Sequence, residues 1–332
     1  MIASHREVVL RCDAGAKHGL GHLSRCMTLA MAIRAAGLEP RLVLKAPKAI
    51  AGRVVAANLP FTEVGADVCH DDPTNWLSSQ TALVVVDSKE ATEAYIAACR
   101  SRCPVVCFDD EVARNLPCDA VINNNPWVRP HDYPADRLLL LGPAFNTVRP
   151  DYFSVSGQQR RGVLVSLGGE DPNDRTSWLV DVLATCIDDL PVHLCIGPAH
   201  PDPEAVIAAC GRVKFDSTIH RSPPTLVPLA AACHLAISAG GTTCYEFAAA
   251  GIAMAVMAIE EHQRRLQSAM VEAGAAVSLG GEGELTSDQV REAIRRLRDD
   301  RISTRLAAAG RRMFPAPGAD RIVAGLASLI EA

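Results

Sequence analysis

The sequence predicts an α/β protein with two domains, each built on a parallel sheet covered by helices on both faces. Short apolar runs alternate with amphipathic stretches from one end of the chain to the other, the pattern that parallel sheets produce. The 332 residues suffice for about two domains. Only 4% of the residues are aromatic, and the abundant alanines allow helices to pack closely on a sheet.

The first half of the chain carries six candidate strands. Each is a short apolar run, often rich in β-branched residues, between polar or turn-forming residues. The runs cover residues 8–10, 42–44, 82–86, 105–108, 120–122 and 138–141. Six strands fit one Rossmann-like domain, which we expect over residues 1–150.

A polar stretch over 146–161, with Pro150 and Gly157, separates this domain from a second one expected over 160–332. The apolar alternation then starts again. Predicted strands cover 163–165, 192–196, 235–237 and 253–258, and predicted helices cover 176–187 and 243–250. The Arg-rich tail over 288–312 is amphipathic, and its charges indicate a solvated helical face.

Composition excludes several classes of protein. With 48% hydrophobic and 21% charged residues the chain is not disordered. The net charge of −5 gives no general attraction for nucleic acid. No apolar run approaches the roughly 18 residues of a membrane span, and the charged start of the chain is unlike a signal peptide. We expect a cytoplasmic protein with no nucleic-acid partner and no stable membrane insertion.

Two groups of residues raise the question of a metal. Cys99, Cys103 and Cys107 recur at a spacing of four, but Pro104 breaks the helix that would align them. The 12 cysteines lie mostly in apolar runs and are expected to be reduced core thiols. The acidic run 109–111 follows a predicted strand and could bind Mg²⁺, although such a run more often caps a helix. We expect no metal and no cofactor.

Three loops follow predicted strands, at the edge where parallel sheets bind ligands. In the first, Gly19 and Gly21 expose backbone N–H groups where a helix begins. His22 stands at that helix start, a position suited to a general base. Arg25, one turn further on, could hold a phosphate or a carboxylate. His18 lies in the same loop and could equally be the base.

The other two loops belong to the second half. The weaker one contains Gly168 and Gly169, which permit close approach of a ligand to the backbone. The stronger one is a strand followed by two glycines, two threonines and a helix with an early carboxylate: Gly240, Gly241, Thr242, Thr243 and Glu246. Its N–H groups and hydroxyls could hold a diphosphate, and Glu246 could accept hydrogen bonds from a ribose diol.

Seven ordered motifs, taken together, resemble a known family. They are Gly19-x-Gly21-His22-x-x-Arg25, Val86-Asp87-Ser88, Phe108-Asp109-Asp110-Glu111, Asn123-Asn124-Asn125-Pro126, Gly142-Pro143 with Arg149-Pro150, Ser166-Leu167-Gly168-Gly169-x-Asp171-Pro172-Asn173, and Ser238-Ala239-Gly240-Gly241-Thr242 with Glu246. The set resembles the UDP-sugar hydrolases of pseudaminic-acid biosynthesis (PseG) and the related spore-coat polysaccharide proteins (SpsG), relatives of MurG-type glycosyltransferases. The likeness covers most of the chain.

The resemblance implies the GT-B architecture and a metal-independent, inverting hydrolysis of a UDP-linked 2,4-diacetamido-2,4,6-trideoxy sugar or a similar nucleotide sugar. It implies that His22 activates water, that Glu246 holds the uridine ribose, and that the Gly240–Thr243 loop holds the diphosphate. Gln263 would contact ribose or sugar. Asp13 would contact the sugar or orient His22.

The chain departs from the family pattern on the sugar side. Asp87 and Ser88 are followed by Lys89, where the family often has tyrosine, and the stretch around Asn146 also differs. These positions, with Asp87, are expected to line the sugar site, and Lys89 would favour a more acidic or differently acylated sugar.

Two other functions use the same residues. A MurG-like glycosyltransferase would hand the sugar to an acceptor, for which the Lys45-to-Arg53 segment is a candidate surface. A non-catalytic nucleotide-sugar binding module would keep the Glu246 loop without needing His22 and Arg25. In each case the partner is a small-molecule nucleotide sugar, and the protein is expected to be a monomer or a weak homodimer.

Overall fold

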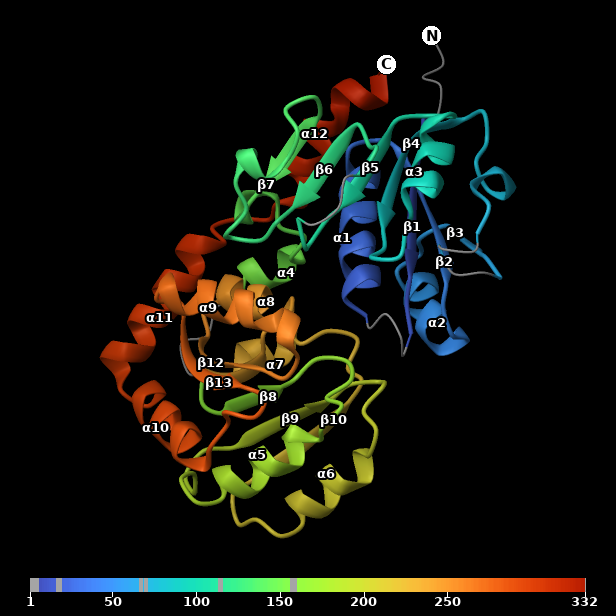
Figure 1. The fold of residues 1–332 in the computed structure, drawn as a ribbon. Helices are drawn as coiled ribbons and strands as arrows, with labels where there is room; N and C mark the ends of the chain where they lie inside the picture. The colour runs from blue at the N-terminus through green and yellow to red at the C-terminus, as the bar shows by residue number, and fades with distance from the viewer. Residues whose placement is uncertain are drawn as a thin grey trace. The chain divides into compact units, whose positions relative to one another are not determined.

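The computed structural model describes residues 6–15, 20–65, 68, 71–112, 116–155 and 160–331. The chain divides into two compact units, the first made of Met1–Val148 and Pro317–Ala332 and the second of Arg149–Ala316 (Figure 1). Each unit is an α/β structure with one parallel sheet, as predicted. Among the described helices none is long and apolar enough to cross a membrane.

The first unit has a seven-stranded sheet in the order β3-β2-β1-β4-β5-β6-β7. Its strands are β1 (Glu7–Asp13), β2 (Glu39–Lys45), β3 (Phe61–Glu63), β4 (Thr81–Asp87), β5 (Val105–Phe108), β6 (Ala120–Asn123) and β7 (Leu138–Leu141). Its helices are α1 (Gly21–Ala35), α2 (Lys48–Ala56), α3 (Glu93–Arg100) and α12 (Ala319–Glu331), with short 3-10 turns at Pro73–Asn75, Pro130–Asp132 and Pro143–Phe145.

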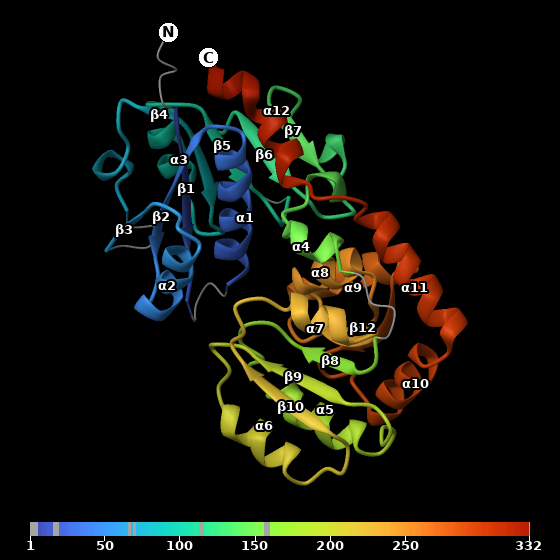
Figure 2. The same ribbon diagram turned by 180° about the vertical axis from the view of Figure 1, so that it is seen from behind.

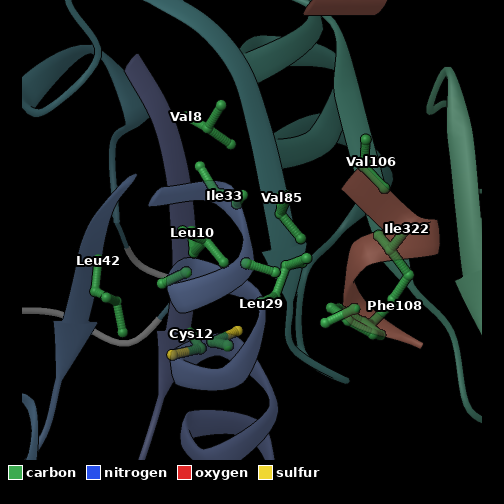
Figure 3. Packing of buried hydrophobic residues seen from close by; sticks show 14 of the residues in the cluster. Val8, Leu10, Cys12, Leu29, Ile33, Leu42, Val85, Val106, Phe108 and Ile322 are labelled. Carbon is green, nitrogen blue, oxygen red and sulfur yellow. The ribbon is translucent and has the colours of Figure 1, made fainter. Parts of the chain in front are cut away.

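Strand β1 shows why these strands read as continuous apolar runs. Successive side chains of a strand point to opposite faces of the sheet. Val8, Leu10 and Cys12 join the core cluster with α1 (Figure 3), whereas Val9 joins the cluster on the other face with Ile96 of α3. Because helices cover both faces, most positions of the strand are apolar, and its two buried charged residues, Arg11 and Asp13, pair with each other.

Helix α12 belongs to the first unit, which differs from the prediction of a second domain running to residue 332. Ile322, Val323, Leu326 and Ile330 recur at helical spacing and are buried in the core cluster that includes α1. Figure 3 shows Ile322 beside Phe108 of β5. The sequence shows that the last helix has an apolar face but not which core this face joins. In the structure it completes the core of the first unit.

The second unit has a six-stranded sheet in the order β10-β9-β8-β11-β12-β13. Its strands are β8 (Val163–Ser166), β9 (Val192–Ile196), β10 (Ser217–Arg221), β11 (Leu235–Ala239), β12 (Ala253–Ala258) and β13 (Ala276–Gly281). Its helices are α4 (Pro150–Phe153), α5 (Arg175–Leu183), α6 (Pro203–Cys210), α7 (Val227–Ala232), α8 (Thr243–Ala250), α9 (Arg264–Glu272), α10 (Ser287–Leu297) and α11 (Asp300–Met313), with a 3-10 turn at Glu261–Gln263.

Three strands, β3, β10 and β13, are absent from the prediction, and all three lie at the edges of the sheets. Two of these strands, β3 and β10, have no fully buried residue, and the apolar run of β13 is interrupted by the exposed Ser278. In β10, for example, the run Ser217–Arg221 contains only one aliphatic side chain, and none of its residues is fully buried. In Figures 1 and 2 this strand lies beside β9, with α5 and α6 nearby.

The parallel strands bring the predicted loops to one edge of each sheet. In the first unit β1 and β4 end next to each other, with Cys12 paired to Asp87 in the register. In the second unit β11 lies between β8 and β12, so the loops after Ser166, Ala239 and Ala258 are neighbours. The described cysteines are free thiols, and Cys99 and Cys107 lie on α3 and β5, on either side of the predicted helix-to-strand junction.

Candidate functional site

His22, Arg25 and Asp87 come together at the carboxyl edge of the first sheet. His22 and Arg25 lie three residues apart at the start of α1, and this spacing places them on the same side of the helix. Asp87 is the last residue of β4. The Nδ1 atom of His22 lies 2.7 Å from Oδ1 of Asp87, and Arg25 donates to both Asp87 oxygens through Nε and Nη2. One buried carboxylate therefore holds both side chains.

Asp87 fixes which nitrogen of His22 carries the proton. Burial by itself would raise the pKa of Asp87, but the charges of Arg25 and His22 outweigh burial and hold that pKa well below its usual value. An ionised carboxylate only accepts hydrogen bonds, so Nδ1 of His22 donates. Nε2 then carries the lone pair and can accept a proton. The imidazole keeps 16% of its surface exposed, which leaves it accessible to a ligand.

Arg25 is shared between two carboxylates. Its Nη1 and Nη2 atoms lie 2.8 and 3.0 Å from the oxygens of Asp110, and its guanidinium stacks 4.4 Å from the centre of the Phe108 ring. One cation between two anions leaves a net negative charge beside His22. Of the two anions predicted for Arg25, a phosphate or a carboxylate, the structure shows carboxylates, those of Asp87 and Asp110.

Asp13 does not orient His22. Its carboxylate accepts hydrogen bonds from the fully buried Arg11 and from the backbone N–H of Val68. Arg11 in turn donates to Asp71 at 3.1 Å. These contacts tie the end of β1 to a neighbouring loop. The orienting carboxylate is Asp87, a residue predicted to line the sugar site, and it is only 1% exposed.

The acidic run after β5 is held by protein partners. Asp109 accepts a hydrogen bond from the hydroxyl of Tyr133 at 3.1 Å, and Asp110 pairs with Arg25. Glu111 lies 3.2 Å from Nζ of Lys89, and both of these side chains are about half exposed. The pairing with Glu111 balances the charge of Lys89. Lys89 and Glu111 line one small hollow together with His22.

Other predicted residues of the first unit fall elsewhere. Gly21 is the first residue of α1, which has no side-chain cap. Gly19 and the alternative base His18 lie outside the described residues. Asn146 is fully buried rather than exposed to a substrate: its amide donates to the carbonyl of Pro143 at 2.9 Å and accepts from the N–H of Val148 at 3.1 Å. Its side chain fixes the turn before the chain enters the second unit.

In the second unit, backbone atoms rather than side chains shape the loop between β11 and α8. A Cβ at Gly240 would lie 2.7 Å from the carbonyl oxygen of Gln263, so only glycine fits there. A Cβ at Gly241 would meet no atom within 4 Å. Helix α8 begins after Thr242 with no side-chain cap. Its first N–H groups and the hydroxyls of Thr242 and Thr243 are the donors that this helix start offers to a ligand.

Glu246 lies one turn into α8 and is half buried. Burial raises its pKa to about 7, although a hydrogen bond with Tyr152 and the charge of Arg149 act in the opposite direction. Tyr152 itself is 1% exposed, and its hydroxyl oxygen accepts the N–H of Leu226 at 3.2 Å. The hydroxyl hydrogen of Tyr152 is therefore available to Glu246, and α4 positions the carboxylate.

The glycines after β8 are open on one side. A Cβ at Gly168 or Gly169 would meet nothing within 4 Å, and Gly168 has a φ of +95°. On their other side, a Cβ at Gly197 would overlap the carbonyl oxygens of both glycines. Gly197 therefore allows the loops after β8 and β9 to pack backbone against backbone, at the same edge as the Gly240 loop.

Asp171, Asp174 and His200 form the one group of metal-ligand type detected in the described chain, with ligand atoms within 4.8 Å of each other. Asp171 accepts hydrogen bonds from the N–H and hydroxyl of Thr176 at 2.8 and 2.6 Å, capping α5. Nδ1 of His200 accepts the N–H of Asp202 at 3.2 Å. Nε2 therefore carries the hydrogen and lacks the lone pair that a metal requires. The group ties two loops together.

Comparison with known proteins agrees with this fold. No family model matches the chain. Over 200 residues it is 30% identical to the spore coat polysaccharide biosynthesis protein SpsG of Bacillus subtilis (strain 168), a match that covers 56% of this chain and 57% of that protein.

Three solved structures are similar over nearly the whole chain. MurG of Acinetobacter baumannii has a TM-score of 0.67 at 15% identity, covering 97% of this chain and 99% of that one. The spinosyn forosaminyltransferase SpnP has a TM-score of 0.70 at 18% identity, covering 99% and 100%. The spinosyn rhamnosyltransferase SpnG, complexed with thymidine diphosphate, has a TM-score of 0.65 at 17% identity, covering 97% and 99%. The protein has the GT-B fold of glycosyltransferases.

The sequence indicates His22 and the glycine loops as site candidates but not how they are supported. It does not show that Asp110 shares Arg25 or that Tyr152 contacts Glu246. The sequence does contain a signal that marks Asp87 as a candidate site residue. A carboxylate that ends a buried apolar strand lies at the ligand-binding edge of the sheet. Its partner depends on β4 lying next to β1, and strand order is set by tertiary packing.

Proposed function

We propose that the protein hydrolyses a UDP-linked sugar with inversion at the anomeric carbon, without a metal ion, in the biosynthesis of a surface polysaccharide or a nonulosonic acid. The sugar would be a 2,4-diacetamido-2,4,6-trideoxyhexose or a close relative. Support comes from the partial match to SpsG, from the GT-B fold, and from the seven sequence motifs.

The pair of His22 and Asp87 carries the proposal. With Nδ1 bound to Asp87, Nε2 of His22 takes a proton from water while the water oxygen attacks the anomeric carbon. The bond between that carbon and the phosphate oxygen breaks, and UDP leaves with the electron pair. The negative charge left by Asp87 and Asp110 around Arg25 balances the imidazolium.

We assign the nucleotide to the second unit. The uncapped start of α8 and the Gly240–Thr243 loop would bind the diphosphate and stabilise its growing charge as it leaves. Ionised Glu246 would accept hydrogen bonds from the ribose hydroxyls. Gln263, whose side chain accepts the N–H of Ile259 at 3.1 Å, keeps its amide N–H₂ for the ribose or sugar.

The main alternative is transfer of the sugar to an acceptor instead of water. It is favoured by the named structural neighbours SpnP and SpnG, which are transferases. The same His22 would then deprotonate an acceptor hydroxyl, so the residues alone do not separate the two reactions.

The deciding experiment measures UDP release from a panel of UDP-diacetamido-trideoxyhexoses and UDP-N-acetylhexosamines, with no acceptor, in ¹⁸O-water. We expect release from the wild type with the label in the sugar, and a fall of about 10³-fold in His22→Asn. His18→Asn is the matched control and should retain activity. Intact UDP binding without release from any donor would contradict hydrolysis of those sugars and favour transfer.

A further inference from the structure

A second hollow, of about 900 Å³, lies in the second unit away from the proposed nucleotide loops. It is lined by His234 and Ala253, which stand at the amino ends of β11 and β12, and by Gly251 at the end of α8. The Gly240 loop lies at the opposite, carboxyl ends of the same strands. The two sites are therefore at opposite ends of α8, about 12 Å apart along an eight-residue helix.

Two arginines of this hollow share the same acceptors. Nη2 of Arg160 donates to the carbonyls of Ala250 and Val155 at 2.9 and 3.0 Å. Nη2 of Arg311 donates to the same two carbonyls at 3.1 and 3.4 Å. Arg160 reaches one further carbonyl, that of Gly251, at 3.2 Å. The two guanidinium groups are thus held side by side although they repel one another.

The described residues offer no carboxylate within ion-pair distance of either guanidinium. Asp300 lines the same hollow but has no ion pair with Arg160 or Arg311. Burial, followed by the charge of Arg311, lowers the pKa of Arg160, as expected for a cation whose charge is poorly compensated. His234 is held in its neutral form, since burial lowers its pKa.

Capping of α8 does not account for both arginines. The last carbonyls of a helix attract cations, but Arg160 alone already reaches Ala250 and Gly251. The place of Arg311 depends on Gly251, which has a φ of +64° and where a Cβ would overlap the guanidinium. The site therefore includes a second cation that the helix end does not need.

We propose that this hollow is a second anion site, taking a small molecule that carries a phosphate group. A guanidinium has five N–H donors, and the bonds to carbonyls leave donors free on both arginines for phosphate oxygens. Ser303 and Thr304 are also among the lining residues, and side chains with hydroxyls suit a hydroxylated body. The volume lies in the range of small-molecule pockets. This site is independent of the proposed hydrolysis.

The test is calorimetric titration of the full chain, saturated with UDP, using inorganic phosphate and glycerol 3-phosphate. We expect one site for glycerol 3-phosphate, weakened at least tenfold in Arg160→Gln and in Arg311→Gln. The matched controls are Arg161→Gln and Arg312→Gln, neighbours in sequence that do not line the hollow, and these should bind as the wild type does. Equal weakening in the controls, or no binding to the wild type, would overturn the proposal.

A second measurement uses only the wild-type protein, so it tests the proposal even if the variants fail to fold. In the wild-type protein, glycerol 3-phosphate should protect Arg160 and Arg311, and not Arg161, from modification by phenylglyoxal, as mapped by peptide mass. Co-sedimentation with phosphatidylglycerol vesicles separates the two sources of phosphate. Binding to vesicles that free glycerol 3-phosphate does not displace would identify a lipid surface and refute a small-molecule site.

Discussion

The two units build their candidate sites by different physical means. In the first unit the site consists of side-chain charges, with Arg25 between Asp87 and Asp110 and with His22 fixed by Asp87. In the second unit the site consists mainly of backbone, with two glycines that admit close approach and an uncapped start of α8. The charged site depends on mutual pairing, whereas the backbone site depends on conformation.

This difference predicts which substitutions damage each site. Removing one member of a buried charged group leaves its partners unpaired, so stability and activity are lost together. A backbone site tolerates changes of side chain until an added atom enters the space of the ligand or of a neighbouring loop. Substitutions at Asp87, Glu246, Gly240, Gly241 and Lys89 test this difference.

The largest effect is expected for Asp87→Asn. The amide cannot hold His22 in the same tautomer, and kcat should fall by about 10²–10⁴-fold. Loss of hydrogen bonds to charged Arg25 should lower the free energy of unfolding by about 2–3 kcal/mol. Asp110→Asn is the control, because Asp110 pairs with Arg25 without holding His22. Equal losses of kcat in both variants would show that Asp87 acts only through Arg25.

Glu246 should give UDP binding a pH dependence. Because ribose hydroxyls donate to the ionised form, affinity should fall as the pH drops below about 7, by up to about tenfold per pH unit. Fluorescence or calorimetric titration from pH 5 to 8 measures this. In Glu246→Gln the slope should disappear, and a slope that persists would assign it to another group.

The raised pKa of Glu246 also predicts how the free energy of unfolding changes with pH. The folded state binds the Glu246 proton more tightly than the unfolded state does. The contribution of Glu246 to the free energy of unfolding is therefore greatest below pH 4.5 and is lost as the pH rises through about 7. Chemical denaturation at pH 5 and at pH 8 should show a smaller difference in Glu246→Gln than in the wild type.

The neighbouring glycines form a matched pair. Gly240→Ala places a Cβ against the backbone of Gln263 and should cost about 1–3 kcal/mol of stability. Gly241→Ala meets no protein atom, so its stability should stay within about 0.5 kcal/mol of the wild type, while UDP affinity falls about tenfold, or about 1.4 kcal/mol. Unchanged UDP affinity in Gly241→Ala would place the diphosphate elsewhere.

The smallest effect is expected for Lys89→Gln. The pair with Glu111 is exposed, so its loss should change stability by less than about 1 kcal/mol. The Lys89→Gln variant tests sugar selectivity, because Lys89 lines the hollow beside His22. We expect the relative kcat/KM among donor sugars to change while UDP affinity does not. A uniform change across all donors would exclude a role in selectivity.

Much of the fold could be predicted because central parallel strands are apolar at most positions. The runs at 82–86 and 105–108 match β4 and β5 closely. Edge strands such as β10 escaped because half of their surface faces away from the core. The end of the second unit was misplaced because α12 shows an apolar face, and sequence periodicity does not say which core that face joins.

Three features follow from the amino-acid sequence without the fold: the strand and helix periodicities, the glycine turns at strand ends, and the position of His22 at the start of a helix. These features are local, since they depend on residues a few positions apart. Tertiary structure alone decided that Asp87 holds His22, that Arg25 and Asn146 are buried, and that Arg160 and Arg311 lie together. Each of these contacts joins segments distant in sequence, so strand order and helix packing had to be known first.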